Sequence, residues 1–312
     1  MTTYQDYNSI FAREIVQHSK GVIFSFSPLS EKHTYQPYSH GISTDAVERL
    51  GELMRHNLVF YSFGEDEVVS YYKKNAFASL EEAAKYAYKN RLPHRDPKQD
   101  GLPSEVLLDL LVQIYNPYAY KLAVRTIFRQ ADNNEIKGYD LTYFTKDTSG
   151  ISLWLGQAKL GGKSYCKSGI DKDLIEKYVT SYLSKQLLFV SDKRISITDD
   201  AKTILEAIEE LNIRTLEDDE AIRAQQLIDL LNKHGIRIKI PCLLAYEENG
   251  IYQDATKLYE RVLTEVEDMK AYFNSHSYTF TGFSPEIIFY VFPIESIDRL
   301  RDKEKGFYAG LC

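Results

Sequence analysis

The sequence predicts a protein of the α/β class, a mixed α/β or α+β sheet with helices around it. One strongly apolar helix is followed by three strand-like segments with antiparallel-type connections, and then by helices and further strands. Hydrophobic residues make up 44% of the 312 residues, which is sufficient for a sizeable core. A chain of this length accommodates about two domains.

Two elements are predicted early in the chain. Residues 43–55 should form a helix, because Val47, Leu50 and Met54 recur at helical spacing. β-branched and aromatic residues at 58–63, followed by a glycine, predict a strand.

A proline-containing loop is predicted to divide the chain. Ser79 and Glu82 form a capping box, and the helix that they open should end before Pro93. The next segment contains a second proline and no apolar periodicity, which is typical of a loop. We therefore expect an N-terminal α/β region at 1–100 and a second domain at 101–312.

The second domain should begin with an apolar helix at 105–114. Strands are expected at 120–130, 139–144 and 151–159, the last two joined by a polar turn. The remaining predicted elements are helices at 171–187, 199–211, 219–234 and 253–273, strands at 236–246 and 286–293, and a short charged helix at the end.

The charge distribution is uneven. The formal net charge of −7 argues against a protein that coats nucleic acid by bulk attraction. Residues 159–194 nevertheless carry eight Lys and Arg against four acids, whereas residues 199–220 carry nine acids. Both segments are compatible with solvated helix faces, but the basic one is also a candidate phosphate-binding surface.

Several classes of protein are disfavoured. No apolar run approaches the ~18 residues of a membrane span, and the opening residues lack an apolar signal segment. Cys166, Cys242 and Cys312 have no paired spacing, which argues against structural zinc and a disulfide framework. The seven histidines show no metalloprotease spacing. We expect a cytoplasmic protein with no membrane association.

Four polar side chains form a candidate catalytic site. Glu105 lies in the first turn of a helix, and Asp140 follows a glycine at the start of a strand. Gln157 and Lys159 end the next strand on one face, and a hairpin would bring them to Asp140. Carboxylate and amide oxygens suit a hard divalent cation. The Lys159 ammonium can hold a water or stabilise charge on a phosphate.

Each of these residues also has an ordinary structural explanation. Glu105 could interact with the helix dipole, and Asp140 could cap a turn. Gln157 and Lys159 could lie on a solvated strand face. Asp109, one turn after Glu105, is expected to be a surface acid rather than an additional ligand.

The pattern resembles the PD-(D/E)XK nuclease superfamily. The residues that carry this resemblance are Glu105, Gly138-Tyr-Asp140 and Gln157-Ala-Lys159. Gln157 stands where most members have an acid, as in the Mrr-like restriction branch, so one negative charge fewer faces a metal. The wider order of Pro103–Glu105, Asn134–Asp140 and Leu155–Lys159, followed by a lysine-rich helix, is similar to the HamA family of the Hachiman antiphage defence system.

This resemblance implies a restriction-endonuclease-like core with an N-terminal α/β segment and extra helices. It implies a bacterial Mg²⁺-dependent deoxyribonuclease, for which Mn²⁺ is an alternative metal, and whose partners are DNA and a HamB-type helicase. Glu105 and Asp140 would bind the metal, Gln157 would complete its shell, and Lys159 would position the attacking water or stabilise negative charge. In the basic segment, Lys163 and Lys167 would contact the DNA backbone.

Two other functions fit parts of the pattern. A non-catalytic module could use the same fold to hold DNA or a helicase, which the glutamine at 157 and the acidic net charge favour. A two-carboxylate glycosidase would need Glu105 and Asp140 to face each other, with no role for Lys159.

Overall fold

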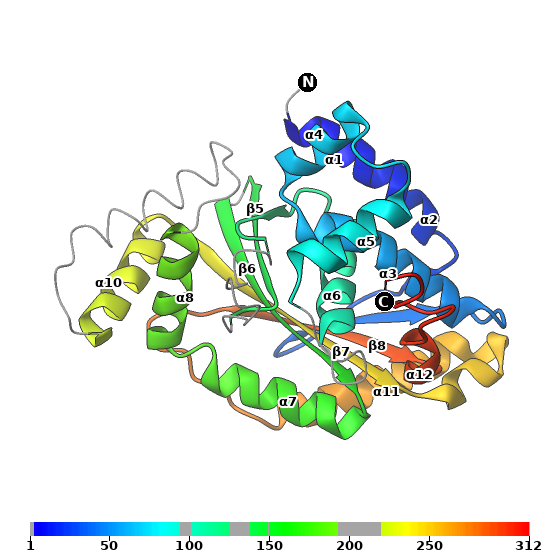
Figure 1. Cartoon of the computed structure of the whole chain (residues 1–312). Helices are drawn as coiled ribbons and strands as arrows, with labels where there is room; N and C mark the ends of the chain where they lie inside the picture. Colours follow the sequence, from blue (N-terminus) through cyan, green and yellow to red (C-terminus); the bar gives the residue numbers. More distant parts are fainter. Residues whose placement is uncertain (1–2, 94–100, 125–137, 149, 193–219, 312) are drawn as a thin grey trace.

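The computed structural model describes residues 3–93, 101–124, 138–148, 150–192 and 220–311. Within these ranges, eight strands form one sheet in the order β1-β3-β8-β7-β6-β5-β4, with β2 paired to β3 (Figure 1). The strands are β1 (Ile23–Ser25), β2 (Leu29–Ser30), β3 (Thr34–His40), β4 (Tyr120–Lys121), β5 (Leu141–Asp147), β6 (Gly150–Gly161), β7 (Arg237–Glu247) and β8 (Glu286–Ile294).

The sheet is mixed, which confirms the predicted fold class. β6, β7, β8 and β3 run parallel to one another, while β5 pairs antiparallel with β4 and β6. The central strands are buried on both faces, as parallel strands are when helices cover a sheet on both sides. β3 pairs directly with β8, so strands from both sides of the expected boundary near residue 100 belong to the same sheet.

Helices cover both faces of the sheet. One core packs between the sheet and α1 (Thr3–Phe11), η1 (Ala12–Val16), α3 (Ala46–Ser62), α4 (Glu65–Lys74), α5 (Leu80–Arg91) and α6 (Leu102–Tyr115). The other packs between the sheet and α7 (Lys163–Glu176), α8 (Thr180–Asp192), α10 (Glu220–Lys233) and α11 (Leu258–Asn274). The two-residue strand period explains this division, since Leu153 and Leu155 face the second core and Trp154 the first. The short helices α2 (Gln17–Ser19), η3 (Asn249–Gln253), η4 (Ala255–Lys257) and α12 (Ile297–Leu300) complete the described elements.

Two local predictions were wrong. Residues 58–62 continue α3 instead of forming a strand. Their sequence suggests a strand because the end of this helix is buried on all sides and so lacks a polar face. The lysine-rich helix begins at Lys163, eight residues earlier than expected, and it ends at Glu176 before α8. Of the predicted strand 120–130, only Tyr120–Lys121 is strand among its described residues, while 125–130 and the predicted helix 199–211 lie outside them.

The Ser79 half of the predicted capping box is confirmed: the Ser79 side chain accepts a hydrogen bond from the Glu82 backbone N–H at 3.2 Å, and α5 ends at Arg91. The Glu82 half differs from the prediction, because the Glu82 carboxylate accepts a hydrogen bond from the backbone N–H of Ala78 at 2.7 Å, one residue before Ser79. In the part of the chain that the structure describes, no helix has both the length and the apolar character that crossing a bilayer requires.

Candidate nuclease site

The β5–β6 hairpin positions Asp140 beside the end of β6. Leu141 pairs with Gly156, and the Asp140 backbone N–H donates to the Gly156 carbonyl at 2.9 Å. The Asp140 carboxylate accepts a hydrogen bond from the Ala158 backbone N–H at 2.8 Å. Asp140 therefore lies next to the Gln-Ala-Lys segment, as the hairpin arrangement predicts.

Helix α6 brings Glu105 to the same place. A Cβ atom at Gly156 would lie 2.9 Å from the Leu108 side chain, so the glycine lets α6 pack closely on β6. Glu105 is buried, with 6% of its surface exposed, and its carboxylate accepts a hydrogen bond from the Tyr61 hydroxyl at 2.5 Å. Tyr61, on α3, thus holds this acid in a defined orientation.

Glu105, Asp140 and Lys159 line one pocket of about 170 Å³. The pocket is open to solvent and its lining is mainly polar, so it can admit water and a charged group. Two further lining residues, Tyr165 and Arg301, were not expected from the sequence. Arg301 follows α12 and adds a second cationic side chain, which the sequence places 142 residues after Lys159 (301 − 159).

The Lys159 side chain is held by α7. Its ammonium forms an ion pair with the Asp173 carboxylate at 2.5 Å, and a Cβ atom at Gly169 would lie 2.9 Å from its Cε atom. Burial lowers the pKa of Lys159, but the negative charges of Asp140 and Asp173 outweigh this and the net pKa is raised. Lys159 therefore stays cationic at neutral pH.

Gln157 lies on the same strand face but does not line the pocket. Its side chain is fully buried, and its carbonyl oxygen accepts a hydrogen bond from the Lys177 ammonium at 2.5 Å. Lys177 also pairs with Asp173 at 3.2 Å. Asp173 consequently joins Lys159 to the Lys177–Gln157 pair, and the role of Gln157 in a metal shell stays a prediction.

The two lysines predicted to contact DNA are paired with acids on α11. Lys163 contacts Glu265 at 2.7 Å and Asp268 at 2.8 Å, and Lys167 contacts Asp268 at 2.8 Å. Their positive charge is thus largely compensated within the chain. Phosphate binding by these side chains stays a prediction and would require them to leave these partners.

Asp109 is not the surface acid that the sequence suggested. It is buried, with 2% of its surface exposed, and it accepts hydrogen bonds from Asn57 at 2.8 Å, Gln113 at 2.7 Å and Tyr143 at 2.5 Å. Burial raises its pKa, although the nearby Lys121 charge acts in the opposite direction. The Asp109 side chain points into the first core. Only the packing of α6 against α3 and β5 reveals this direction.

A small cavity of about 20 Å³ connects this buried cluster with the candidate site. Asp109, Lys121, Tyr61 and Asp140 are among the residues that line it. Its volume suffices for about one water molecule. The polar residues behind the site are therefore structurally linked to Asp140.

The signals that could have identified the missed residues are modest. Asp173 and Lys177 are four residues apart on a helix, a spacing that permits an ion pair but is common on solvated faces. Tyr61 is an aromatic residue in an apolar run and shows no sequence signal of its contact with Glu105.

Comparison with curated proteins finds none that matches this chain. Comparison with protein-family models gives a match to the HamA family over residues 14–311, which is nearly the whole chain and includes every residue of the candidate site. The chain therefore belongs to the HamA family and is an antiphage defence protein of the Hachiman type.

Proposed function

We propose that this protein is a metal-dependent deoxyribonuclease that acts with a HamB-type helicase. The observation that supports this most directly is the convergence of Glu105, Asp140 and Lys159 on one open polar pocket. Two carboxylates beside a lysine are the groups that metal-assisted phosphodiester hydrolysis needs. Family membership and the resemblance to PD-(D/E)XK nucleases agree with this reading.

The pocket residues fit a hard cation. Glu105 and Asp140 offer carboxylate oxygens, the type of ligand that Mg²⁺ prefers, and hydrogen bonds from the Tyr61 hydroxyl and the Ala158 backbone N–H help to orient them. A pocket of about 170 Å³ also leaves space for the waters that Mg²⁺ usually retains. When bound there, Mg²⁺ or Mn²⁺ would lower the pKa of a water and neutralise phosphate charge.

The protein's own residues would orient the reacting groups. Lys159 presents its charge at the pocket wall and can stabilise negative charge on a phosphate oxygen or hold a water. Asp173 and Gly169 on α7 determine where this ammonium lies, so α7 acts as a positioning element. Gln157 contributes indirectly, through Lys177 and Asp173.

The helicase would supply most of the DNA affinity. Because Lys163 and Lys167 are paired with Glu265 and Asp268, little of the charge of these two lysines is available to attract phosphates. We expect the isolated protein to bind DNA weakly. Salt-sensitive binding by the isolated protein as tight as that of the complex would contradict this.

A second function, a non-catalytic module for DNA or helicase binding, is favoured by one observation. Among the described residues that line the pocket, two are carboxylates, Glu105 and Asp140, and the Gln157 amide is not part of the wall. This module would bind DNA in complex with the helicase without cutting it.

The test uses the protein co-expressed and purified with its helicase. Plasmid cleavage is measured with Mg²⁺, with Mn²⁺ and with EDTA, and DNA binding is measured in parallel. Asp140→Asn should abolish cleavage without loss of binding. Asp147→Asn is the matched control, because Asp147 ends β5, the strand that Asp140 precedes, is exposed and pairs with Arg237 away from the pocket. Binding without metal-dependent cleavage in the unaltered complex would leave the non-catalytic module as the function.

A further inference from the structure

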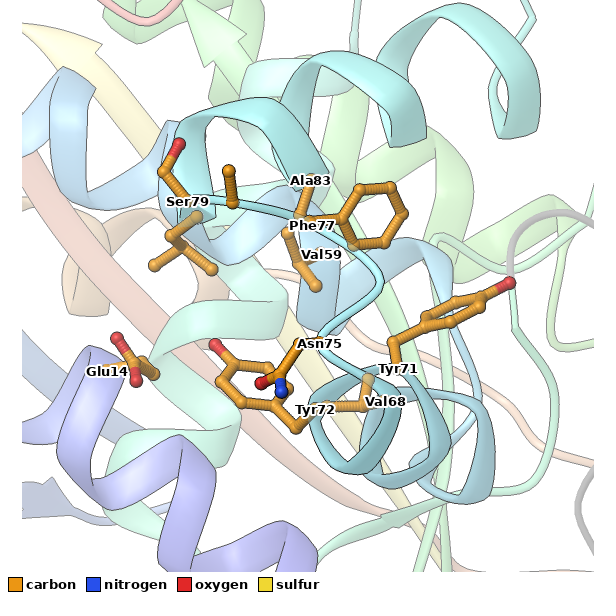
Figure 2. A pocket seen from close by; sticks show the side chains of 11 residues that line it. Glu14, Val59, Val68, Tyr71, Tyr72, Asn75, Phe77, Ser79 and Ala83 are labelled. Atoms are coloured by element: carbon orange, nitrogen blue, oxygen red, sulfur yellow. The ribbon is translucent and has the colours of Figure 1, made fainter.

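A second pocket, of about 270 Å³, lies among η1, α3, α4 and the start of α5 (Figure 2). We call it the aromatic pocket, because its wall contains Tyr71, Tyr72 and Phe77. Figure 2 shows the Tyr72 hydroxyl pointing toward the Glu14 carboxylate on the facing helix. The pocket shares no lining residue with the candidate nuclease site.

The backbone is irregular at two polar residues of this pocket, Glu14 and Asn75. Glu14 belongs to η1, a short π-helix, and such bulges occur frequently at functional sites. Asn75 ends α4 with a positive φ of 48°, in the left-handed region that asparagine tolerates better than most residues. Both residues line the pocket, so each irregular backbone segment presents a polar side chain to it.

The chemistry of the wall favours a flat cation. Aromatic faces attract cations, and a carboxylate accepts hydrogen bonds from a guanidinium with good geometry. The chain already shows this fit at the rim, where the Arg13 guanidinium carbon lies 5.6 Å from the Tyr72 ring centroid and pairs with Glu14 at 2.7 Å. The Arg13 side chain is 59% exposed, and exposed ion pairs of this kind are weak and easily exchanged. An anionic ligand would be repelled by Glu14.

The size of the pocket and its surroundings indicate a side chain rather than a free ligand. Its volume is below the ~300–1,000 Å³ of ordinary small-molecule sites, so it accommodates a single side chain. The aromatic surface also continues outside the pocket: Phe77 packs against Tyr86 with ring centroids 5.3 Å apart, and Tyr86 is 40% exposed. Exposed tyrosines beside a pocket are typical of protein interfaces.

We propose that the aromatic pocket binds the guanidinium group of an arginine side chain from a partner polypeptide. Glu14 pairs with the guanidinium, the aromatic rings of the wall pack on its plane, and Tyr86 contacts the neighbouring residues of the partner. This surface would serve recognition and is separate from the proposed nuclease chemistry.

The first test uses the full-length protein and two small probes followed by NMR. N-acetyl-argininamide should bind saturably, whereas N-acetyl-citrullinamide, which is nearly isosteric but neutral, should bind at least about fivefold more weakly. Glu14→Gln should remove this preference. Arg13→Ala should bind argininamide at least as tightly as the parent, because a competing guanidinium is gone. Glu52→Gln, an exposed acid on α3 outside the pocket lining, is the control and should bind like the parent.

A second arm identifies the source of the arginine. A peptide with arginine between leucine and phenylalanine should bind more tightly than argininamide, and Tyr86→Ser should weaken the peptide alone. Equal binding of the arginine and citrulline probes, or binding that is unchanged in Glu14→Gln, would overturn the proposal. Tyr86→Ser leaving peptide affinity unchanged would overturn the assignment to a polypeptide. The probe comparison within the parent protein decides the issue even if a variant fails to fold.

Discussion

Replacing Gly169 with alanine should slow DNA cleavage while leaving the fold intact. Gly169 lies on α7 directly against the Lys159 stem, and a Cβ atom there would be 2.9 Å from Cε, 3.1 Å from Cδ and 3.3 Å from Cγ. The contacted atoms form the far end of a flexible side chain, so the stem can yield. The ammonium would then move away from its 2.5 Å contact with Asp173.

The expected effects on stability nearly cancel. Alanine is better than glycine in a helix interior by about 0.8–1 kcal/mol. Displacing Lys159 weakens one ion pair between partly buried side chains, 17% exposed for Lys159 and 10% for Asp173, which costs on the order of 1 kcal/mol. The free energy of unfolding should therefore change by less than about 1 kcal/mol.

The effect on catalysis should be much larger. A catalytic group misplaced by about 1 Å can reduce the rate on the order of 100-fold. The assay is the initial rate of plasmid cleavage by the complex with its helicase, together with urea unfolding of the isolated protein. Gly162→Ala is the matched control, because a Cβ atom there meets nothing within 4 Å. A Gly169→Ala rate within about twofold of the parent would refute the positioning role of α7.

Three further predictions concern the residues around the site. Lys159→Ala should slow cleavage roughly 100-fold. It should also lower the free energy of unfolding by about 1–3 kcal/mol, because buried Asp173 loses a partner. An unchanged cleavage rate would remove Lys159 from the mechanism. Tyr61→Phe should raise the Mg²⁺ concentration needed for half-maximal cleavage, since Glu105 loses the 2.5 Å hydrogen bond that orients it, and an unchanged metal titration would argue against this. Burial raises the pKa of Asp109, so the folded state releases this proton at a higher pH than the unfolded state does. The free energy of unfolding should therefore fall as the pH rises from about 4 through the raised pKa. Asp109→Asn should flatten that part of the stability profile in urea unfolding at several pH values, and an unaltered profile would contradict the assignment.

The sequence by itself predicts most elements of this fold. Helix α6 is predicted from its long apolar run, and the β5–β6 hairpin and strands β7 and β8 from their apolar strand-like segments; all appear near their expected positions. The sequence-based prediction fails for residues 58–62, because a helix that is buried all round has no polar face to reveal its helical period.

The sequence also predicts that Asp140 meets the Gln-Ala-Lys segment, because a hairpin is a local structure and its register follows from the turn. Strand period alone places Gln157 and Lys159 on one face. The location of Glu105 at the pocket wall depends on contacts between segments that are far apart in the sequence. It depends on α6 packing against β6 at Gly156, which the sequence marks only by a glycine within a strand.

Only the tertiary structure decided which charges are available and which are compensated. The pairs Lys159–Asp173, Lys163–Glu265 and Lys167–Asp268 join residues that are 14 to 102 positions apart (173 − 159 and 265 − 163). Composition shows a basic segment but cannot show where its partners lie, because an ion pair depends on distance in space and on burial. The packing of α7 and α11 on the sheet determines both the distances between these charges and their burial. It therefore determines which charges can face a ligand.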